Sequence, residues 1–242
     1  MTGFGRPRGR AIPLPAGRRR PLQAVIFDMD GVLVDSFDVM RQAFEIAYHE
    51  VVGVGQPPFA EYNRHLGRYF PEIMDIMGLP QAMQKPFVRE SYRLAGQVTM
   101  FDGVREMVAE LRAQGLRTAV ATGKSGERAR SLLSLLGMLD QFDFVIGGDE
   151  VQRAKPAPDM VLRALELLQI APQETFMVGD AVTDIISARG ASVASVAATW
   201  GQGDSEALLA QRPDGILHAP LEILDFCRGW NATVRRSDLS VG

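Results

Sequence analysis

The sequence predicts an α/β fold, in which a Rossmann-like core with a parallel sheet carries an inserted α-helical cap domain. Two observations support this prediction. Short apolar runs alternate with stretches of helical periodicity from residue 24 to residue 217, and about sixty residues after the first run contain helical patterns alone. Strands that alternate with helices are typical of parallel sheets covered by helices on both faces. The length of 242 residues is near the upper end for one domain, which fits a core with an insertion.

The core elements are predicted in chain order from their hydrophobic patterns. Continuous apolar runs are typical of strands buried on both faces, and they occur at 24–27, 118–121, 142–146, 175–178, 193–198 and 215–217. Apolar residues at helical spacing predict intervening helices at 103–114, 132–136, 159–168 and 183–189. Gly115 and Gly137 mark the ends of the first two helices.

The insertion is recognised by its lack of strand-like runs. Between about Phe37 and Thr99 the apolar residues follow helical spacing only, and Pro57, Pro71 and Pro80 separate the helical stretches. We therefore expect a core made of two segments, a helical cap between them and a tail at each end. The expected boundaries are 22–37 and 99–228 for the core, 38–98 for the cap, 1–21 for a disordered basic tail and 229–242 for a C-terminal tail.

The basic tail is rich in positive charge but contains no recognisable targeting signal. Residues 1–21 hold six arginines, four prolines and no acidic residue, and such a segment buries too little apolar surface to become ordered. No apolar stretch of the length of a secretory signal follows the arginines. The remainder of the chain carries about −9 and would repel phosphate groups, so no nucleic-acid partner is expected.

Composition excludes several other classes of protein. With 46% hydrophobic and 23% charged residues, the chain resembles an ordinary soluble protein rather than a disordered or collagen-like one. A single cysteine, Cys227, excludes an internal disulfide framework and a multi-cysteine zinc site. No window approaches the ~18 continuous apolar residues of a membrane span. We therefore expect a cytoplasmic location and no membrane partner.

Polar residues follow four of the predicted strands. The first strand ends in Asp28-Met29-Asp30-Gly31, the second in Thr122-Gly123-Lys124, and the fourth in Gly179-Asp180 with Asp184 shortly after, while the third leads to Lys155-Pro156. Ligands of open parallel sheets bind at the carboxyl ends of the strands. Carboxylates that meet there repel each other unless cations neutralise them. A divalent cation with oxygen ligands, Mg²⁺ above all, together with Lys155 would do so.

These four motifs, in this order and spacing, resemble those of the haloacid dehalogenase (HAD) superfamily over residues 22–228. The resemblance implies the HAD fold and phosphoryl transfer. It implies that Asp28 is the nucleophile and that Asp30 is the general acid for the leaving alcohol and then the base for water. It further implies that Thr122, Gly123 and Lys155 bind phosphate.

The resemblance also implies a Mg²⁺ cofactor. Asp180 and Asp28 would hold the ion together with the main-chain carbonyl of Asp30, and Asp184 would support this site. Lys124 opens a helix beside the site, and whether it touches phosphate or solvent is left open.

Departures from the family pattern narrow the reaction. Asp30 argues for phosphate chemistry, because the dehalogenases lack this second aspartate. β-Phosphoglucomutase-like members usually have Glu-Asp where this chain has Gly179-Asp180, which favours a phosphatase over a mutase. Gly123 replaces a frequent Asn or Ser and Ala181 a frequent Ser, and both changes could loosen contacts to phosphate.

The insertion resembles the C1 cap of phosphoglycolate-phosphatase-like members. Arg64, His65 and Arg68 are the candidates in the cap for gripping the substrate, with a solvated helix face as an equal alternative. More narrowly, the runs 61–80 and 121–125 resemble phosphatases of 3-amino-5-hydroxybenzoate (AHBA) formation in ansamycin antibiotic biosynthesis. That resemblance would suggest a sugar or amino-sugar phosphate as substrate.

We therefore expect a Mg²⁺-dependent phosphatase that hydrolyses a small, soluble phosphorylated metabolite through an aspartyl-phosphate. A sugar phosphomutase of the β-phosphoglucomutase type is the alternative enzyme. A non-catalytic protein that binds phosphorylated ligands is the alternative of another class. The oligomeric state is left open, with a monomer favoured over an oligomer.

Overall fold

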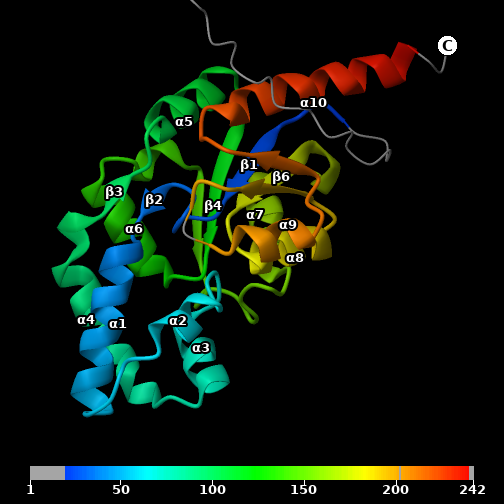
Figure 1. The fold of residues 1–242 in the computed structure, drawn as a ribbon. Coiled ribbons are helices and arrows are strands. Elements are labelled where there is room, and N and C mark those ends of the chain that lie inside the picture. Colours follow the sequence, from blue (N-terminus) through cyan, green and yellow to red (C-terminus); the bar gives the residue numbers. More distant parts are fainter. Residues whose placement is uncertain (1–19, 202, 240–242) are drawn as a thin grey trace, which may run out of the picture.

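The computed structural model describes residues 20–201 and 203–239, and it shows the predicted α/β fold (Figure 1). The core is a six-stranded sheet with the strand order β5-β4-β1-β6-β7-β8, and every neighbouring pair is parallel. The strands are β1 (Ala24–Phe27), β4 (Arg117–Thr122), β5 (Phe144–Gly147), β6 (Thr175–Gly179), β7 (Ala194–Ala198) and β8 (Gly215–Leu217).

The central strand β1 lies between β4 and β6, and its side chains alternate between two apolar layers. Phe27 is level with Val120 of β4 and Val178 of β6, so the residues after these strands are brought to the same edge. Val25 and Phe27 face one cluster of buried side chains, whereas Ala24 and Ile26 face the other. This alternation follows from the two-residue period of a strand.

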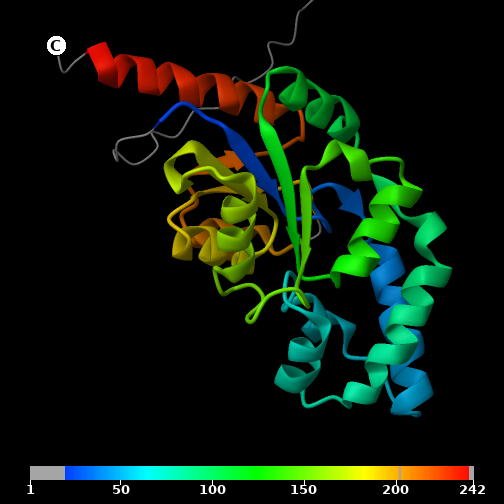
Figure 2. The ribbon, with the colours of Figure 1, turned by 180° about the vertical axis from the view of Figure 1, so that it is seen from behind.

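Helices cover both faces of the sheet. Those on the Phe27 side are α5 (Val104–Ala113), α6 (Gly126–Leu135) and α10 (Glu222–Leu239). Those on the Ile26 side are α7 (Asp159–Leu168) and α8 (Val182–Gly190), and α9 (Ser205–Ala210) packs beside α8. Short 3-10 helices, η3 (Leu139–Gln141) and η4 (Pro172–Glu174), precede β5 and β6. Figure 2 shows the two helical layers from behind.

A separate group of helices lies beyond the carboxyl ends of the core strands. It comprises α1 (Phe37–Val51), α2 (Phe59–Asn63), α3 (Phe70–Met77), η1 (Gln81–Met83), α4 (Gln84–Arg93) and η2 (Ala95–Gln97). These helices share an apolar cluster of their own, which includes Phe44, Tyr62 and Phe87. Two short antiparallel strands, β2 (Val34–Asp35) and β3 (Thr99–Met100), join the group to the core at both its ends. We call this group the cap and propose that it is a domain inserted into the core.

The C-terminal helix continues past residue 228, where the sequence analysis placed the start of a tail. α10 extends to Leu239 because Trp230 and Val234, one turn apart, are buried against the core. The Trp230 ring lies 5.9 Å from the ring of Phe176, and its indole N–H donates a hydrogen bond to the carbonyl of Arg20. Residues 229–239 are therefore part of the fold. The predicted disorder of residues 1–19 and the tail at 240–242 lie outside the described residues.

None of the helices within the described part of the chain has the length and apolar character that crossing a membrane requires.

Candidate active site

Asp28 occupies the centre of the sheet edge that faces the cap. It directly follows β1, and its backbone N–H donates a hydrogen bond to Val178 of β6, which extends the strand pairing by one residue. The residue is 3% exposed. Its position is therefore fixed by the rigid middle of the sheet rather than by a loop.

Lys155 lies behind Asp28 and is buried completely. Its Nζ is 2.8 Å from Oδ1 of Asp28 and 2.6 Å from Oδ1 of Asp184, and it donates a hydrogen bond to the carbonyl of Ala121. Burial opposes the charge of Lys155, but the Asp184 and Asp28 carboxylates outweigh burial and raise its pKa above the usual range. The two carboxylates therefore favour the charged form of the ammonium group beside Asp28.

Three of the predicted metal residues come together around this lysine. Asp28, Asp180 and Asp184 each offer a carboxylate oxygen, and these oxygens lie within 4.8 Å of one another. Asp184 is already engaged, since its second oxygen accepts a hydrogen bond from the Ala181 N–H. Among the described residues, no donor lies within hydrogen-bond distance of the Asp180 carboxylate.

The raised pKa values of Asp28 and Asp180 indicate an excess of negative charge in this cluster. Burial raises the pKa of Asp180 well above its usual value, and the charges on Asp28 and Asp184 raise it further. Burial also raises the pKa of Asp28 to about 7, against the opposing effect of Lys155. Buried carboxylates that repel one another and have unused oxygens fit a hard divalent cation such as Mg²⁺.

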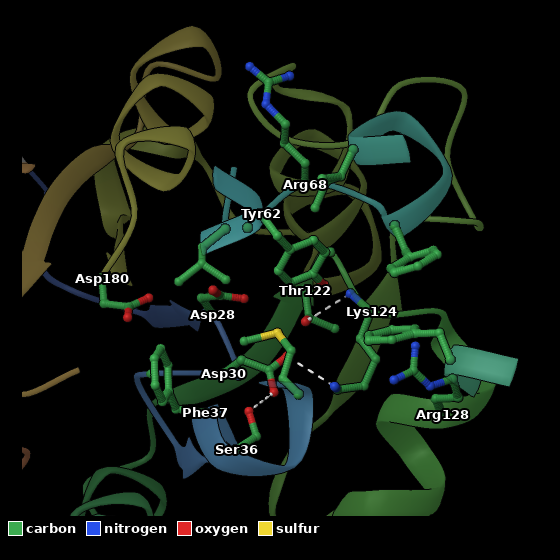
Figure 3. A pocket seen from close by; sticks show the side chains of 18 of the residues that line it. Asp28, Asp30, Ser36, Phe37, Tyr62, Arg68, Thr122, Lys124, Arg128 and Asp180 are labelled. Carbon is green, nitrogen blue, oxygen red and sulfur yellow. Dashed lines mark hydrogen bonds and ion pairs between the residues drawn. The ribbon is translucent and has the colours of Figure 1, made fainter. Parts of the chain in front are cut away.

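The Asp30 carboxylate points elsewhere, toward the pocket under the cap (Figure 3). One of its oxygens accepts a hydrogen bond from the Ser36 hydroxyl, and the other lies 3.2 Å from Nζ of Lys124. Although burial opposes ionisation, Lys124 and the Ser36 hydrogen bond lower the pKa of Asp30. Of the four predicted metal residues, Asp30 is thus the one whose carboxylate is not in the cluster, and only its main chain could serve the ion.

Gly31 allows the Asp30 side chain to point toward the pocket while the other carboxylates stay in the cluster. Its φ of +79° lies in the left-handed region, and a Cβ at this position would lie 1.9 Å from Oδ2 of Asp180. The glycine therefore allows the chain to turn after Asp30 and allows Asp180 to approach the turn.

Thr122 and Gly123 end β4 beside Asp28. Thr122 is 1% exposed, and its hydroxyl accepts a hydrogen bond from the Lys124 N–H. Gly123 touches the cap: a Cβ there would lie 2.5 Å from the carbonyl oxygens of Gly67 and Arg68. The loop between α2 and α3 is also held by Thr183, whose hydroxyl donates to the carbonyl of Leu66. The cap thus rests directly on the end of the sheet.

The pocket lies between this sheet edge and the cap (Figure 3). The cap contributes an apolar lining of Phe37, Met40, Phe70, Ile73 and Phe87, together with the ring of Tyr62. Of the three predicted cap residues, Arg68 lines the pocket, but Figure 3 shows its side chain pointing away from the carboxylates. Arg64 is exposed and His65 is half-buried, and neither lines the pocket.

Arg128 is a residue of the pocket that the sequence analysis missed. It belongs to α6 and is 9% exposed, and its guanidinium carbon lies 5.1 Å from the centre of the Phe87 ring. Helical spacing from Lys124 could not have found it, because Lys124 precedes α6, which begins at Gly126. Ser36 was also missed, because its role depends on the turn after Asp30.

The comparisons with known proteins agree with this geometry. A family model described as haloacid dehalogenase-like hydrolase matches residues 25–198. A putative pyrophosphatase of Caldanaerobacter subterraneus is 31% identical over 213 residues, which are 86% of this chain and 96% of the relative. A phosphoglycolate phosphatase of Chromobacterium violaceum is 32% identical over 202 residues, 77% of this chain and 89% of the relative.

A solved structure, a haloacid dehalogenase-like hydrolase from Streptococcus pneumoniae, is 27% identical and superposes with a TM-score of 0.73, covering 85% of this chain and 98% of that one.

Proposed function

The chain belongs to the haloacid dehalogenase-like hydrolases, and from this we propose that it is a Mg²⁺-dependent phosphatase acting on a small phosphomonoester through Asp28. The observation that carries the proposal is the placement of the Asp28 carboxylate, which lines the pocket while Lys155 holds it from behind. Relatives named as phosphoglycolate phosphatase and as putative pyrophosphatase support a hydrolase of phosphate compounds.

In the first step, an oxygen of Asp28 attacks the phosphorus atom of the substrate. The new bond joins Asp28 to phosphorus, and the bond between phosphorus and the alcohol oxygen breaks. Asp30 must carry a proton taken up from water for this step, and it gives that proton to the departing alcohol; Ser36 and Lys124 hold the resulting carboxylate on the pocket side. Lys155 neutralises charge on the phosphoryl group, and Thr122 donates a hydrogen bond to one of its oxygens.

In the second step, water attacks the aspartyl-phosphate and Asp30 takes up a proton from it. The bond between Asp28 and phosphorus breaks, inorganic phosphate leaves, and Asp28 is restored. The cap shields this intermediate, because the loop at Gly67 and Arg68 lies directly on Gly123. Exclusion of bulk water strengthens the electrostatic contacts inside the pocket.

We propose Mg²⁺ as the cofactor because the carboxylates of Asp28 and Asp180 are buried together with excess negative charge. A bound ion would neutralise phosphoryl oxygens during the transfer. Asp28, Asp180 and the main-chain carbonyl of Asp30 would hold it. Asp184 acts as a positioning residue, because both of its oxygens are bound within the protein by Lys155 and Ala181.

The two other functions receive less support. The fold alone would also suit a mutase, but the relatives reported above are named as hydrolases. A non-catalytic binding protein is disfavoured because Asp28, Asp30, Thr122 and Asp180 all line one pocket and Lys155 pairs with Asp28 from behind. The narrower resemblance to AHBA phosphatases gains no support from the names of these relatives, so antibiotic biosynthesis is not part of the proposal. We infer action in the cytoplasm without nucleic-acid or membrane partners, and the oligomeric state stays open, with a monomer favoured over an oligomer.

The proposal is tested with purified protein, p-nitrophenyl phosphate and Mg²⁺. We expect phosphate release that stops with EDTA and returns with added Mg²⁺, and we expect Asp28→Asn to remove it. Mg²⁺ should also raise the melting temperature of the wild type but not of Asp180→Asn, which gives a readout of metal binding apart from activity. Full activity in Asp28→Asn, or in EDTA after exhaustive dialysis, would contradict the proposal.

A further inference from the structure

Arg128 carries its charge in a buried position where none of the described residues offers an acidic partner. It is 9% exposed, and burial is the largest influence on its pKa, which is lowered. Within the part of the chain that the structure describes, no carboxylate forms an ion pair with its guanidinium and no acceptor receives its hydrogen bonds. Buried guanidinium groups normally have such partners, because an unpaired buried charge is strongly destabilising.

The surroundings of Arg128 leave its donors facing open space. The Phe87 ring of the cap covers the guanidinium at 5.1 Å, and Figure 3 shows the group turned toward Lys124 and the pocket. A second cavity between α1, α4 and α6 shares several lining residues with the first, namely Ser36, Met40, Phe87, Lys124 and Arg128. A ligand in the pocket can therefore reach Arg128.

The nearby acids do not satisfy this charge. Asp30 interacts with Arg128 only at long range, and its two oxygens are engaged by Ser36 and Lys124. The Tyr62 ring lies in the same lining, but a neutral phenol does not balance a cation. An anion bound from solution would supply both the missing charge and the missing hydrogen-bond acceptors.

We propose that Arg128 forms a second anion subsite, and that the substrates are phosphomonoesters whose alcohol portion bears a carboxylate or a second phosphate. The inference rests on the proposed phosphatase function and names its substrate class. The transferred phosphoryl group lies at Asp28 and the second anion at Arg128. A guanidinium binds carboxylate and phosphate alike, with two parallel hydrogen bonds.

A positioning role is the competing explanation, in which Arg128 acts only through Asp30 or by holding Phe87 of the cap. Such a role would affect all phosphomonoesters equally. A subsite affects only substrates with a second anion, so the two explanations differ in the ratio of activities on matched substrates.

The experiment compares kcat/KM within two matched pairs. One pair is 2-phosphoglycolate and ethyl phosphate, which differ in a carboxylate, and the other is 1,3-propanediol bisphosphate and propyl phosphate, which differ in a phosphate. We expect the wild type to prefer the member with the second anionic group in at least one pair by 10-fold or more. Arg128→Met should reduce that ratio to near one, and Arg128→Lys should retain part of it. The pair that shows the preference identifies the second anion as carboxylate or phosphate.

The matched control is Arg163→Met, which removes an exposed arginine of α7 paired with Glu166 and should keep the wild-type ratio. A ratio near one in the wild type for both pairs, an unchanged ratio in Arg128→Met, or equal losses on both members would overturn the subsite. Melting temperatures verify that both Arg128 variants fold, and the lysine variant preserves the test if the methionine variant does not.

Failure of the proposed function gives a different result. If no phosphomonoester is hydrolysed, including p-nitrophenyl phosphate, the phosphatase proposal fails, and calorimetry with phosphonoacetate and ethylphosphonate tests the subsite by itself. Tighter binding of phosphonoacetate that weakens 10-fold or more in Arg128→Lys and Arg128→Met supports the subsite. Equal affinity for both phosphonates in the wild type overturns it.

Discussion

Lys155 and Asp28 form a buried ion pair of 2.8 Å, in which the lysine is wholly inaccessible to solvent and the aspartate nearly so. The same ammonium group also faces Asp184 at 2.6 Å. The same contact therefore serves both the proposed nucleophile and the stability of the fold, because without the lysine the buried carboxylates of Asp28 and Asp184 would lose their positive partner.

Lys155→Met should therefore lose both stability and activity. Removal of one member of a buried ion pair costs about 3–5 kcal/mol of unfolding free energy. Urea denaturation in EDTA measures this loss. Lys85→Met is the matched control, because Lys85 is exposed in the cap, and it should unfold like the wild type. An unchanged midpoint for Lys155→Met would show that the pair does not stabilise the core.

Asp30→Asn should separate substrates by their leaving group. An alkoxide needs the proton that Asp30 supplies, so kcat/KM for ethyl phosphate should fall by about 10²–10⁴-fold. p-Nitrophenolate leaves without a proton, and its ester should lose much less. Asp38→Asn, on an exposed side chain of α1, serves as the control. Equal losses on both esters would indicate that Asp30 acts in some way other than proton transfer.

Gly123→Ala should disturb the contact between the end of β4 and the cap loop at residues 67–68. The added methyl group would stand 2.5 Å from two backbone carbonyl oxygens, which cannot rotate away like a flexible side chain. The loop at residues 67–68 must shift, and we expect kcat/KM to fall by roughly 10–100-fold. Hydrogen exchange of amides 64–69 should become faster.

Gly229→Ala is the control for Gly123→Ala, because a Cβ at residue 229 would meet no atom within 4 Å. Wild-type activity in Gly123→Ala would mean that the cap does not need this close contact during turnover.

Cys227 gives a prediction on pH. Burial raises the pKa of its thiol from 9.0 to about 12. The native protein at pH 8 should therefore resist labelling by a thiol reagent and should react fully in urea. Above pH 9 the thiol ionises only in the unfolded chain, so the unfolding free energy falls as pH rises from 9 toward 12.

Urea midpoints of the wild type and Cys227→Ala, compared between pH 8 and 10.5, measure this effect. The advantage of the wild type should shrink across the range. Rapid labelling of the native protein at pH 8, or a constant difference between the two midpoints, would contradict the burial of this thiol.

The sheet was predictable because its strands carry a strong local signal. Ala24–Phe27 and Thr175–Gly179 are continuous apolar runs, and their polar ends meet because parallel strands in register bring them to one edge. β2 and β3 could not be found in this way, since two residues each are too short to show a period. α10 was cut short although Cys227, Trp230 and Val234 recur at helical spacing on its buried face.

The site residues at the ends of strands could be predicted from the sequence, whereas the positions of side chains on loops could not. Asp28 and Asp180 directly follow strands and Thr122 ends one, and the structure brings the three together at one pocket. The direction of the Asp30 carboxylate depends on Ser36 and Lys124, which approach it only in the folded turn. In the cap, the sequence indicated a polar stretch, but the conformation of the loop between α2 and α3 decides that Arg68 lines the pocket and that Arg64 faces solvent.

The contact between Trp230 and Arg20 has a mechanical consequence. Together with the hydrogen bond from the Leu22 N–H to the Asn231 side chain, it fastens the start of the described chain to its last helix. Figures 1 and 2 place this junction at the opposite end of the sheet from the cap. A force applied between residue 20 and α10 would therefore first load that junction, while the cap and the pocket lie outside the loaded contacts.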